Sequence, residues 1–466
     1  MTTDAERWAA AAAWSRRTTL TPMETVLWRA ERHPVQSSVS VLAMELDAAP
    51  EWERFVAAHE WGTRLVARLR QRVVDPALPT TAPVWAVDED FDLDRHVRRT
   101  AAADRDEALT LAAELAVQPL DRDHPLWTGL LVEGLEGGRA LWVLKIHHAL
   151  ADSLGAVELL SLLQSHTREH VPDKPVVPGP SVSDAPDPVD LATRGLLHDL
   201  TALPVRGAEL ARGAVTAALH PRAVTGAGLR YAASLRRLVS RQPAPPSPVL
   251  ASRDRREWRF LALTCPLEGL RAVGAEAGGS LADVTVAAVL GGLQRYHAAH
   301  DSSPAALPVA VRVSLDRADD LGNRFATAMV SGPLGIDDPI DRIAAVRGEV
   351  LSLHTERALD AFAAFAPVAN RLPAAVGAGV LASGAAADAF VLTLPGPSQA
   401  AYMTGARVEG LWSFGPLPGT ALTATLVTYD GIGCLGVTVD AAAVDDLDVL
   451  RECLAEGLAE MASAAG

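Results

Sequence analysis

The spacing of apolar and polar positions divides the chain into two structured parts joined by a polar connection. Up to about residue 170, short apolar runs typical of strands alternate with segments whose apolar residues recur at helical spacing. Between Pro172 and Pro188 the chain is rich in proline, serine and aspartate, which predicts a surface linker. A new strand is expected at Arg256–Thr264, where the second structured part begins. We therefore predict two domains with a long crossover between them.

Within the first part, two apolar runs predict a β-hairpin. Leu130–Glu133 and Leu141–Ile146 are separated by the glycine-rich segment Gly134–Gly138. A helix is expected over Gly155–His166, because its leucines and one valine recur on one side. The hairpin therefore ends at a turn between a buried strand and a helix.

Candidate chemistry lies in that turn. The strand ends in His147 and His148, and Asp152 follows four residues after the second histidine. A histidine at the end of a buried strand can be held rigidly with one ring nitrogen facing a cavity, which suits a general base that titrates near neutral pH. Asp152 falls at the start of the predicted helix, where its carboxylate can accept backbone N–H groups or pair with an arginine. The pattern gives one proton-transfer residue, His148, and one residue that holds the turn in shape.

Two other interpretations of the histidine pair stay open on these residues alone. One histidine can be a hydrogen-bonded core residue and the other a surface residue without a function. A metal site is the second alternative, but adjacent strand residues point to opposite faces, so only one histidine could join Asp152. No third ligand occurs at a suitable spacing in the sequence, and we expect no metal.

The segments on either side of the turn carry a resemblance to a known family. Pro119–Arg122, Pro125–Trp127, the hairpin and the His147-His148-x-x-x-Asp152 pattern together resemble the bacterial wax ester synthase/diacylglycerol acyltransferases. That family belongs to the CoA-dependent acyltransferases with a His-His-x-x-x-Asp-Gly motif, which include chloramphenicol acetyltransferase-like enzymes and nonribosomal-peptide condensation domains. Further segments resemble the family in its own order: Leu20–Glu24, Arg29–Glu31, Val84–Trp85, Asp90–Arg98, Gly279–Tyr296, Leu321–Arg324, Asp337–Arg342, Leu394–Pro397, Gly405–Val408, Gly415–Leu417 and Tyr429–Gly431.

Three positions depart from the family's pattern. Ser153 stands where the motif closes with a glycine, a residue that usually provides a positive φ or a close backbone approach. Gly155 is a candidate to take over part of that role. Ala282 and Thr393 stand where the family usually shows asparagine, near the tunnel that the resemblance implies. These changes leave the acyltransferase interpretation in place and the acceptor open.

The resemblance implies an α/β (α+β) fold of two chloramphenicol-acetyltransferase-like domains. Each domain would hold a mixed β-sheet with flanking helices, and an active-site tunnel would run between the two. We place the N-terminal acyltransferase-like domain at residues 1–170 and the C-terminal one at residues 251–466. Residues 171–250 would form a proline-rich linker and an arginine-bearing helical crossover.

The resemblance also implies roles for the residues of the motif. His148 would deprotonate the acceptor hydroxyl, the alkoxide would attack the acyl thioester directly, and the imidazolium would protonate the departing thiolate. His147 would face away from the tunnel and pack. Asp152 would be structural, paired with Arg312 or with another arginine of the second domain.

Substrate contacts are expected in loops around the tunnel. Besides Ser153 and Gly155, the candidates are Asn323 and the backbone around Pro395 and Gly396, which could supply the oxyanion donor. Asn323 can equally be a turn residue, and the Pro395–Pro397 loop can be a rigid wall. Trp127 and Trp142 are expected to be core aromatic residues.

Composition narrows the partners. The chain has 466 residues, 49% of them hydrophobic, which is enough to bury two cores. A net charge of -15 argues against nucleic acid as a partner, because phosphate backbones attract clustered Lys and Arg. The three cysteines are far apart, which implies neither a disulfide framework nor a zinc knuckle. We expect no cofactor beyond acyl-CoA as a substrate, and a cytoplasmic protein, because the first residues lack the basic region of a signal peptide.

A local basic segment stands out in this acidic chain. Residues 191–241 carry eight arginines against two acidic residues, with leucines between them. They can form a peripheral helix whose leucines enter a membrane or lipid-droplet surface while the arginines meet anionic headgroups. They can equally form a bridging helix pair with a solvated basic face. The apolar run Pro373–Ala387 predicts a buried helix, since it is shorter than a bilayer span.

Two functional classes follow. The first is an O-acyltransferase that moves a fatty acyl group from acyl-CoA to diacylglycerol or a long-chain alcohol. The second is an acyl- or condensation-type transferase of secondary metabolism with a nonlipid acceptor or a carrier-protein-bound donor. A degenerate relative that binds acyl-CoA without turnover is disfavoured by the intact His148 and Asp152. The sequence fixes neither the acyl chain length nor the oligomeric state.

Overall fold

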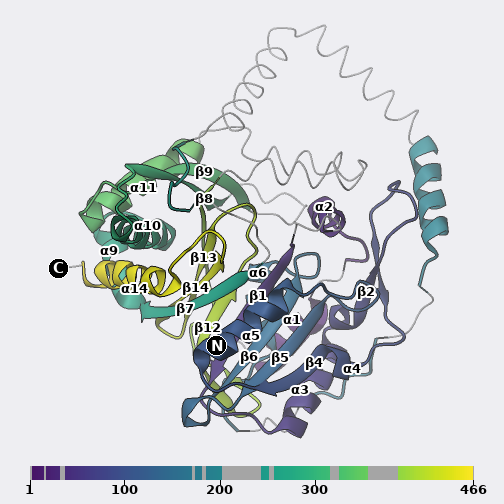
Figure 1. Cartoon of the computed structure of the whole chain (residues 1–466). Helices are drawn as coiled ribbons and strands as arrows, with labels where there is room; N and C mark the ends of the chain where they lie inside the picture. Colours follow the sequence, from purple (N-terminus) through teal and green to yellow (C-terminus); the bar gives the residue numbers. More distant parts are fainter. Residues whose placement is uncertain are drawn as a thin grey trace.

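Two six-stranded sheets lie side by side, each with helices packed on it (Figure 1). The computed structural model describes residues 3–14, 17–31, 37–169, 174–180, 185–201, 243–250, 257–314, 325–354 and 387–464. The predicted mixed α/β architecture with two sheet-bearing domains is confirmed. Asn323, residues 202–241 of the basic segment and all but the last residue of the run 373–387 lie outside the described residues.

The first sheet is built mainly from the N-terminal half, in the order β11-β12-β1-β6-β5-β4. Its pairs are antiparallel except for β4 with β5, which run parallel. A separate two-stranded sheet, β2 with β3, lies beside it. These strands are β1 (Val39–Leu46), β2 (Gln71–Val74), β3 (Val84–Val87), β4 (Val97–Ala101), β5 (Trp127–Glu133), β6 (Ala140–His147), β11 (Tyr402–Met403) and β12 (Ala406–Phe414).

The second sheet comes from the C-terminal half, in the order β7-β14-β13-β10-β8-β9. Strand β10 runs parallel to both of its neighbours, so the sheet is mixed. Its strands are β7 (Trp258–Pro266), β8 (Ala306–Ser314), β9 (Phe325–Pro333), β10 (Ala389–Leu394), β13 (Leu422–Tyr429) and β14 (Ile432–Asp440).

Helices cover both sheets and supply the rest of the two cores. In the first half α5 and α6 pack on β1, whereas in the second half α10 packs on β10, α11 and α14. The helices are α1 (Asp4–Ala13), α2 (Pro22–Ala30), α3 (Trp52–Leu65), α4 (Leu93–His96), α5 (Arg105–Val117), α6 (Ser153–Leu163), α9 (Leu267–Glu276), α10 (Leu281–Ala299), α11 (Pro339–His354) and α14 (Leu447–Ser463), with short 3-10 turns at Ala67–Arg70 and Glu136–Gly138 and a further helix over residues 188–201.

The predicted hairpin and helix are present, with shifted helix ends. Strands β5 and β6 pair antiparallel across a connection in which Gly134, Gly137 and Gly138 have positive φ. Helix α6 begins two residues before the predicted start, because the Asp152 side chain caps it by accepting the Gly155 N–H. It ends at Leu163, since the backbone turns extended at Gln164 and Ser165 pairs with Tyr402.

A strand of the C-terminal half lies in the sheet of the N-terminal half, which the predicted division of the chain at residue 251 did not include. Strand β12 leaves the C-terminal half and pairs with β1, so that it completes the first sheet. The Phe414 ring stacks on Phe260 of β7 at a centroid distance of 4.1 Å, and Trp412 Nε1 donates to Leu263 O at 2.9 Å. This strand therefore joins the two sheets through a shared apolar contact.

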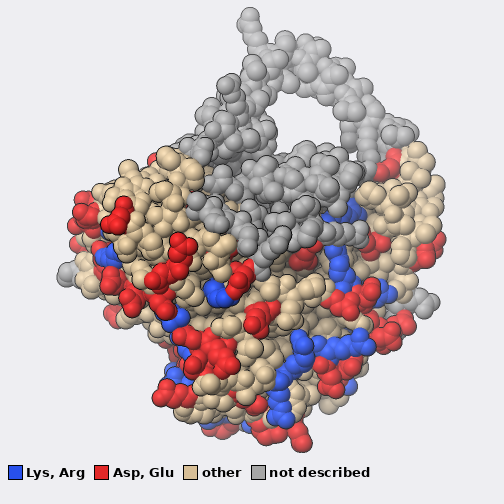
Figure 2. Space-filling model, in the orientation of Figure 1, with Lys and Arg blue, Asp and Glu red and all other residues tan. Residues whose placement is uncertain are grey.

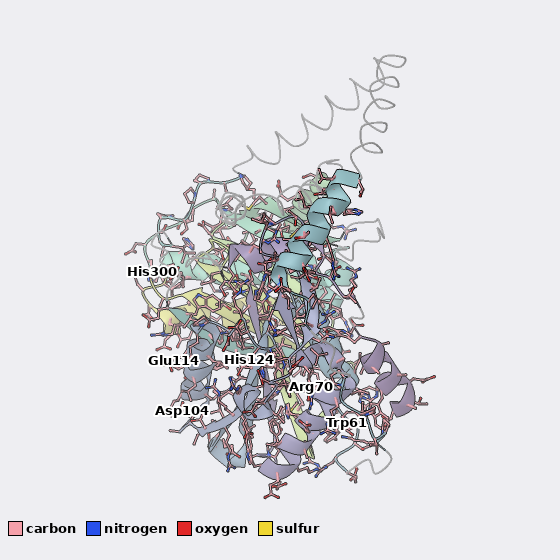
Figure 3. All side chains as sticks on the ribbon, turned by 90° about the vertical axis from the view of Figure 1, so that its right-hand side faces the viewer. Trp61, Arg70, Asp104, Glu114, His124 and His300 are labelled. Atoms are coloured by element: carbon pink, nitrogen blue, oxygen red, sulfur yellow. The ribbon has the colours of Figure 1, made fainter. Side chains whose placement is uncertain are left out.

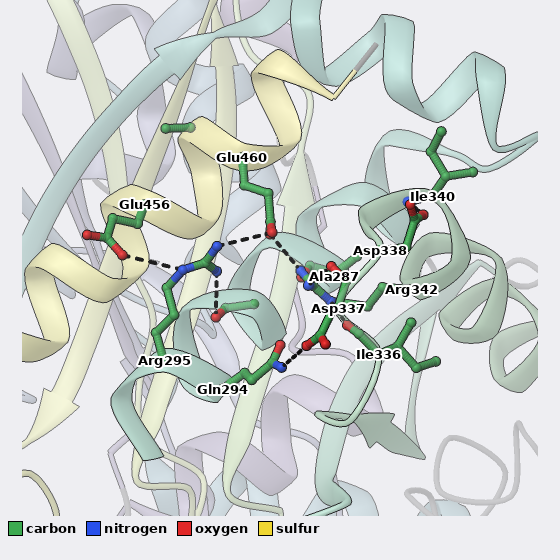
Figure 4. Close-up of polar contacts among 12 residues, drawn as sticks. Ala287, Gln294, Arg295, Ile336, Asp337, Asp338, Ile340, Arg342, Glu456 and Glu460 are labelled. Carbon is green, nitrogen blue, oxygen red and sulfur yellow. Dashed lines mark hydrogen bonds and ion pairs between the residues drawn. The ribbon is translucent and has the colours of Figure 1, made fainter. Parts of the chain in front are cut away.

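One fully buried arginine ties three helices of the C-terminal half together (Figure 4). The Arg342 guanidinium lies 2.8 Å from a Glu460 carboxylate oxygen and donates to the carbonyls of Ile336 and Asp337. Arg295 of α10 reaches the same glutamate at 3.1 Å. The segment Asp337–Arg342, which carries part of the family resemblance, is thus a structural junction.

The surface agrees with the acidic composition. Acidic side chains are spread over both halves on the face seen in Figure 2, with fewer basic ones, several of which form a continuous stretch in the lower part of the view. Within the described part of the chain, no single helix has both the length and the apolar composition of a membrane span. Helices α9 and α10, bent by 103° relative to each other, meet that test only when taken as a pair.

Candidate active site

The turn after β6 holds His148 in one orientation and one tautomer. Its backbone N–H and its ring Nδ1 both approach the carbonyl oxygen of Ser38, at 2.7 and 2.9 Å. Because a carbonyl only accepts hydrogen bonds, Nδ1 carries the proton and Nε2 keeps a lone pair when the ring is neutral. Burial lowers the pKa of His148 against the opposing effects of Asp152 and the Ser38 bond, so the ring is neutral near pH 7. The half-buried His148 can therefore accept a proton at Nε2.

His147 is fully buried on the opposite side of the strand, as expected for a packing residue. Its Nδ1 accepts the Ala149 N–H at 2.9 Å, which leaves the proton on Nε2. Nε2 lies 2.8 Å from Glu31 Oε2, an electrostatic contact whose direction is too oblique for a regular hydrogen bond. The Trp28 ring meets the imidazole edge to face.

Glu31 connects the two histidines, and sequence reasoning gave it no role. Besides contacting His147, its carboxylate accepts the Ser38 N–H at 3.1 Å, and the Ser38 carbonyl in turn fixes His148. Burial raises the pKa of Glu31, but the contacts with His147 and Ser38 outweigh this effect and hold it below the ordinary value of 4.5. Glu31 was visible only as the last residue of a family-like segment, Arg29–Glu31, more than a hundred residues before the histidines.

Asp152 lies at the contact between the two halves. One carboxylate oxygen accepts the Gly155 N–H at 2.8 Å, and the other lies 3.4 Å from Arg312 Nη2 on β8. The structure thus selects Arg312 among the second-half arginines that the sequence left open. Asp152 makes no hydrogen bond with His148 among the described contacts, and its holding role stays a prediction.

The backbone conformation of Ser153 does not require a glycine, although the family motif has glycine at this position. It is the first residue of α6, with no positive φ, and its hydroxyl lies 2.7 Å from that of Ser40 on β1. A Cβ at Gly155 would lie 3.2 Å from Asp152 Oδ1, so Gly155 keeps the close approach that lets its N–H reach the carboxylate. Gly155 has no positive φ, so it does not take over that role of the motif glycine, and a close approach of its backbone to a ligand stays a prediction.

The loop after β10 engages the Gly396 N–H in an internal hydrogen bond. Gly396 N–H donates to Thr428 Oγ1 at 3.1 Å, and a Cβ at this position would lie 2.3 Å from the Thr428 carbonyl oxygen. Pro395 precedes it directly after the strand. Thr393 Oγ1 lies 3.0 Å from Thr285 Oγ1 of α10. Asn323, the other candidate donor, lies outside the described residues.

Titratable groups elsewhere do not form a metal site within the described ranges. No set of three His, Cys, Asp or Glu side chains there has metal-binding geometry. The turn after β6 thus presents the unprotonated Nε2 of His148, and Arg312 is the cation that pairs with Asp152.

Comparison with known proteins identifies the family. The model of the wax ester synthase/diacylglycerol acyltransferase catalytic domain matches residues 20–285, and that of the WS/DGAT C-terminal domain matches residues 321–462. Rv2484c, a Mycobacterium tuberculosis protein assigned as a diacylglycerol O-acyltransferase, is 35% identical over 96% of this chain and 92% of its own length. Rv3087 of the same organism, with the same assignment, is 30% identical over 84% of this chain and 85% of its own length.

Solved structures share the fold. The wax ester synthase/diacylglycerol acyltransferase from Marinobacter aquaeolei VT8 superposes with a TM-score of 0.63 and 21% identity, over 96% of this chain and 100% of that one. The first condensation domain of the calcium-dependent antibiotic synthetase superposes with a TM-score of 0.61 and 17% identity, over 97% and 98%. Together with the family matches, these findings confirm the resemblance seen in the motifs. The chain belongs to the wax ester synthase/diacylglycerol acyltransferase family, and it is an acyltransferase.

Proposed function

We propose that this enzyme transfers a fatty acyl group from acyl-CoA to the hydroxyl of diacylglycerol or a long-chain alcohol, with His148 as the general base. The observation that carries the proposal is the pair of bonds from His148 to the Ser38 carbonyl, which leaves Nε2 as the proton acceptor. The names of the relatives support acyl transfer and the acceptor class, and the acyl-CoA donor rests on the resemblance of the His-His-x-x-x-Asp motif.

The proposed reaction needs no covalent enzyme intermediate. His148 Nε2 takes the proton of the acceptor hydroxyl as its oxygen attacks the thioester carbonyl carbon. When the tetrahedral intermediate collapses, the C–S bond breaks and the CoA thiolate takes that proton back from Nε2. The ester and the free thiol leave, and the neutral imidazole is restored. Asp152 and Arg312 would hold the turn that aims the ring, rather than transfer protons themselves.

The test measures thiol release from palmitoyl-CoA with and without hexadecanol or dipalmitoylglycerol, with the ester identified by chromatography. We expect release that depends on the acceptor and falls about 10²-fold to 10⁴-fold in His148→Ala, the usual contribution of a general base. His300→Ala, at a half-buried histidine that caps the end of α10 in the C-terminal half, is the matched control. Undiminished ester formation by His148→Ala would refute the role of His148, and absence of release by the wild type would refute the substrates.

We also propose that the helix at residues 188–201 contacts a lipid surface. Four of its apolar side chains are 50 to 62% exposed at helical spacing, and they form one stripe. The other side of the helix packs on the Thr80 region, where Thr80 Oγ1 donates to Ala192 O at 2.8 Å. The exposed residues are Val189, Leu196, Leu197 and Leu200.

Flotation with anionic liposomes tests this contact. The triple change Leu196→Ser, Leu197→Ser and Leu200→Ser should abolish co-flotation, because it removes most of the apolar stripe. Leu351→Ser, at a 51% exposed leucine of α11, is the matched control and should leave it unchanged. Equal flotation of the two variants would contradict the proposal.

A further inference from the structure

A partly open cavity lies in the N-terminal half, between α3, α6 and the β6 face of the first sheet. Its volume is about 280 Å³, and its lining is mainly apolar. His148 does not line it, although Ile146, two residues earlier, does. The side chains that define its walls include Ala58, Leu69, Trp142, Ile146, Leu160 and Leu163.

A glycine inside α3 keeps this cavity open. Gly62 lies in the last turns of the helix, and a Cβ built on it would meet only the Leu163 methyl groups, at 3.9 Å. That distance is an ordinary contact, so neighbouring atoms do not require a glycine. Glycine in a helix interior costs about 1 kcal/mol relative to alanine. The clear structural effect of Gly62 is the space that a side chain would otherwise fill.

The inner wall is uncharged and firmly packed. The Trp142 ring lies flat on β5, since a Cβ at Gly129 would come within 2.0 Å of it. His59 donates from Nδ1 to the Phe55 carbonyl at 2.8 Å, and burial lowers its pKa to about 4, so its ring is neutral. The cavity has about twice the volume of a 150 Å³ apolar cavity that binds benzene, which leaves room for roughly ten to twelve carbon atoms.

Two cations stand at the outer end of the cavity. Lys174 is half-buried, with Nζ 4.7 Å from the centroid of the Trp61 ring, and Arg54 is exposed beside it. Neither has a carboxylate within ion-pair distance among the residues that the structure describes, although Glu169 also lines this end. Trp61 Nε1 donates to Pro175 O at 3.0 Å and so holds the segment that carries Lys174. Trp61 lies at the edge of the N-terminal half, well away from His300 at the end of α10 (Figure 3).

We infer that this cavity binds the unbranched hydrocarbon chain of a fatty acyl compound, with an anionic group held at Lys174 and Arg54. An apolar space with a preformed wall takes up a hydrocarbon chain because the chain leaves water, and cations at the rim favour a carboxylate or a phosphate. Two sources share this chemistry: a free fatty acid, or acyl-CoA with its phosphates. The existence of this binding site does not depend on the proposed reaction. Only the identification of its ligand as the acyl-CoA substrate rests on the proposed function.

Binding is measured without turnover, by quenching of tryptophan fluorescence with 11-bromoundecanoate and by calorimetry with dodecanoate and with dodecanoyl-CoA. Trp142 and Trp61 line the cavity, so a bound bromine quenches emission there. Gly62→Leu should weaken binding at least about tenfold, and Lys174→Gln should weaken it less. Gly348→Leu is the matched control, because a Cβ at this exposed helical glycine meets nothing within 4 Å. Thermal unfolding verifies that each variant is folded. Gly62→Ala fills less of the cavity than Gly62→Leu and serves as a second variant.

The outcomes separate the two sources and the two proposals. Binding of equal strength in wild type and in Gly62→Leu overturns the inference. If Gly62→Leu loses binding and also shifts turnover toward shorter acyl-CoA chains, the source is the substrate. If it loses binding with the chain-length profile unchanged, the source is a free fatty acid. If the wild type binds the fatty acyl probes, Gly62→Leu does not, and the wild type releases no thiol from acyl-CoA, the proposed function is refuted and the inference stands.

Discussion

Replacement of Glu31 by alanine tests whether a largely buried carboxylate positions His148, the proposed general base, without a direct hydrogen bond to it. Among the contacts of the described residues, Glu31 makes no hydrogen bond with His148. It accepts the Ser38 N–H at 3.1 Å and faces His147 Nε2 at 2.8 Å, and the Ser38 carbonyl holds His148 Nδ1. Glu31→Ala would therefore free the start of β1 and, with it, the acceptor that fixes the tautomer of the base.

The expected cost follows from the donor that loses its partner. Glu31→Ala leaves the Ser38 N–H without its acceptor, which costs about 1–3 kcal/mol for a buried donor, and it also removes the carboxylate that faces His147 Nε2 without a regular hydrogen bond. The Glu31 side chain is 22% exposed, so water can replace part of the loss, and about 2 kcal/mol is expected for the free energy of unfolding. A displacement of about 1 Å at the base reduces turnover by as much as about 10²-fold. KM should change little, because Glu31 is not placed to touch the substrate.

The assay combines kcat, KM and chemical denaturation of wild type, Glu31→Ala and Glu31→Gln. The glutamine keeps an acceptor for the Ser38 N–H, so Glu31→Gln should recover most of kcat. Because the folded-state pKa of Glu31 lies below 4.5, the wild type's stability advantage over Glu31→Gln is present above pH 4.5 and is lost as the pH falls through the lowered pKa. Equal kcat in wild type and Glu31→Ala, despite the loss of stability, would refute the positioning role.

Three further predictions concern the base, the arginine junction and the loop after β10. Since burial lowers the pKa of His148 below 6.5 and the base must be neutral, kcat/KM should persist as the pH falls through 6.5 and decline only at lower pH; a decline centred above 6.5 would contradict this. Arg342→Met should lower the free energy of unfolding by about 3–5 kcal/mol, because it leaves Glu460 without its buried cation. The exposed pair partner Arg451, 3.1 Å from Asp106, is the control, and Arg451→Met should cost less than about 1 kcal/mol; similar losses in the two variants would refute the junction. Gly396→Ala should destabilise by about 1–3 kcal/mol, since its Cβ would lie 2.3 Å from the Thr428 carbonyl oxygen, whereas Gly348→Ala should not.

Local features of the site could be predicted from the sequence because short-range physics sets them. The apolar runs and the glycines of the connection gave the β5–β6 hairpin, and Asp152 marked the start of α6 to within two residues. Strand alternation predicted that His147 and His148 face opposite ways, and the family resemblance implied that His147 is the one that packs in the core, where it is buried. In each case the deciding contacts join residues only a few positions apart.

The tertiary structure decided what joins distant segments. The sequence offered many arginines for Asp152, and only the packing of β8 against the α6 start brought Arg312 to it. Glu31, Ser38 and His148 meet because β1 pairs with β6, and β12 joins the first sheet from almost four hundred residues away. The cavity above Trp142 arises where α3 and α6 cross the sheet, and Trp127 and Trp142, buried as expected, also form its wall. Periodicity and capping determine single helices and strands. Contacts between distant residues depend on which faces of these elements pack together, and that packing depends on the whole chain at once.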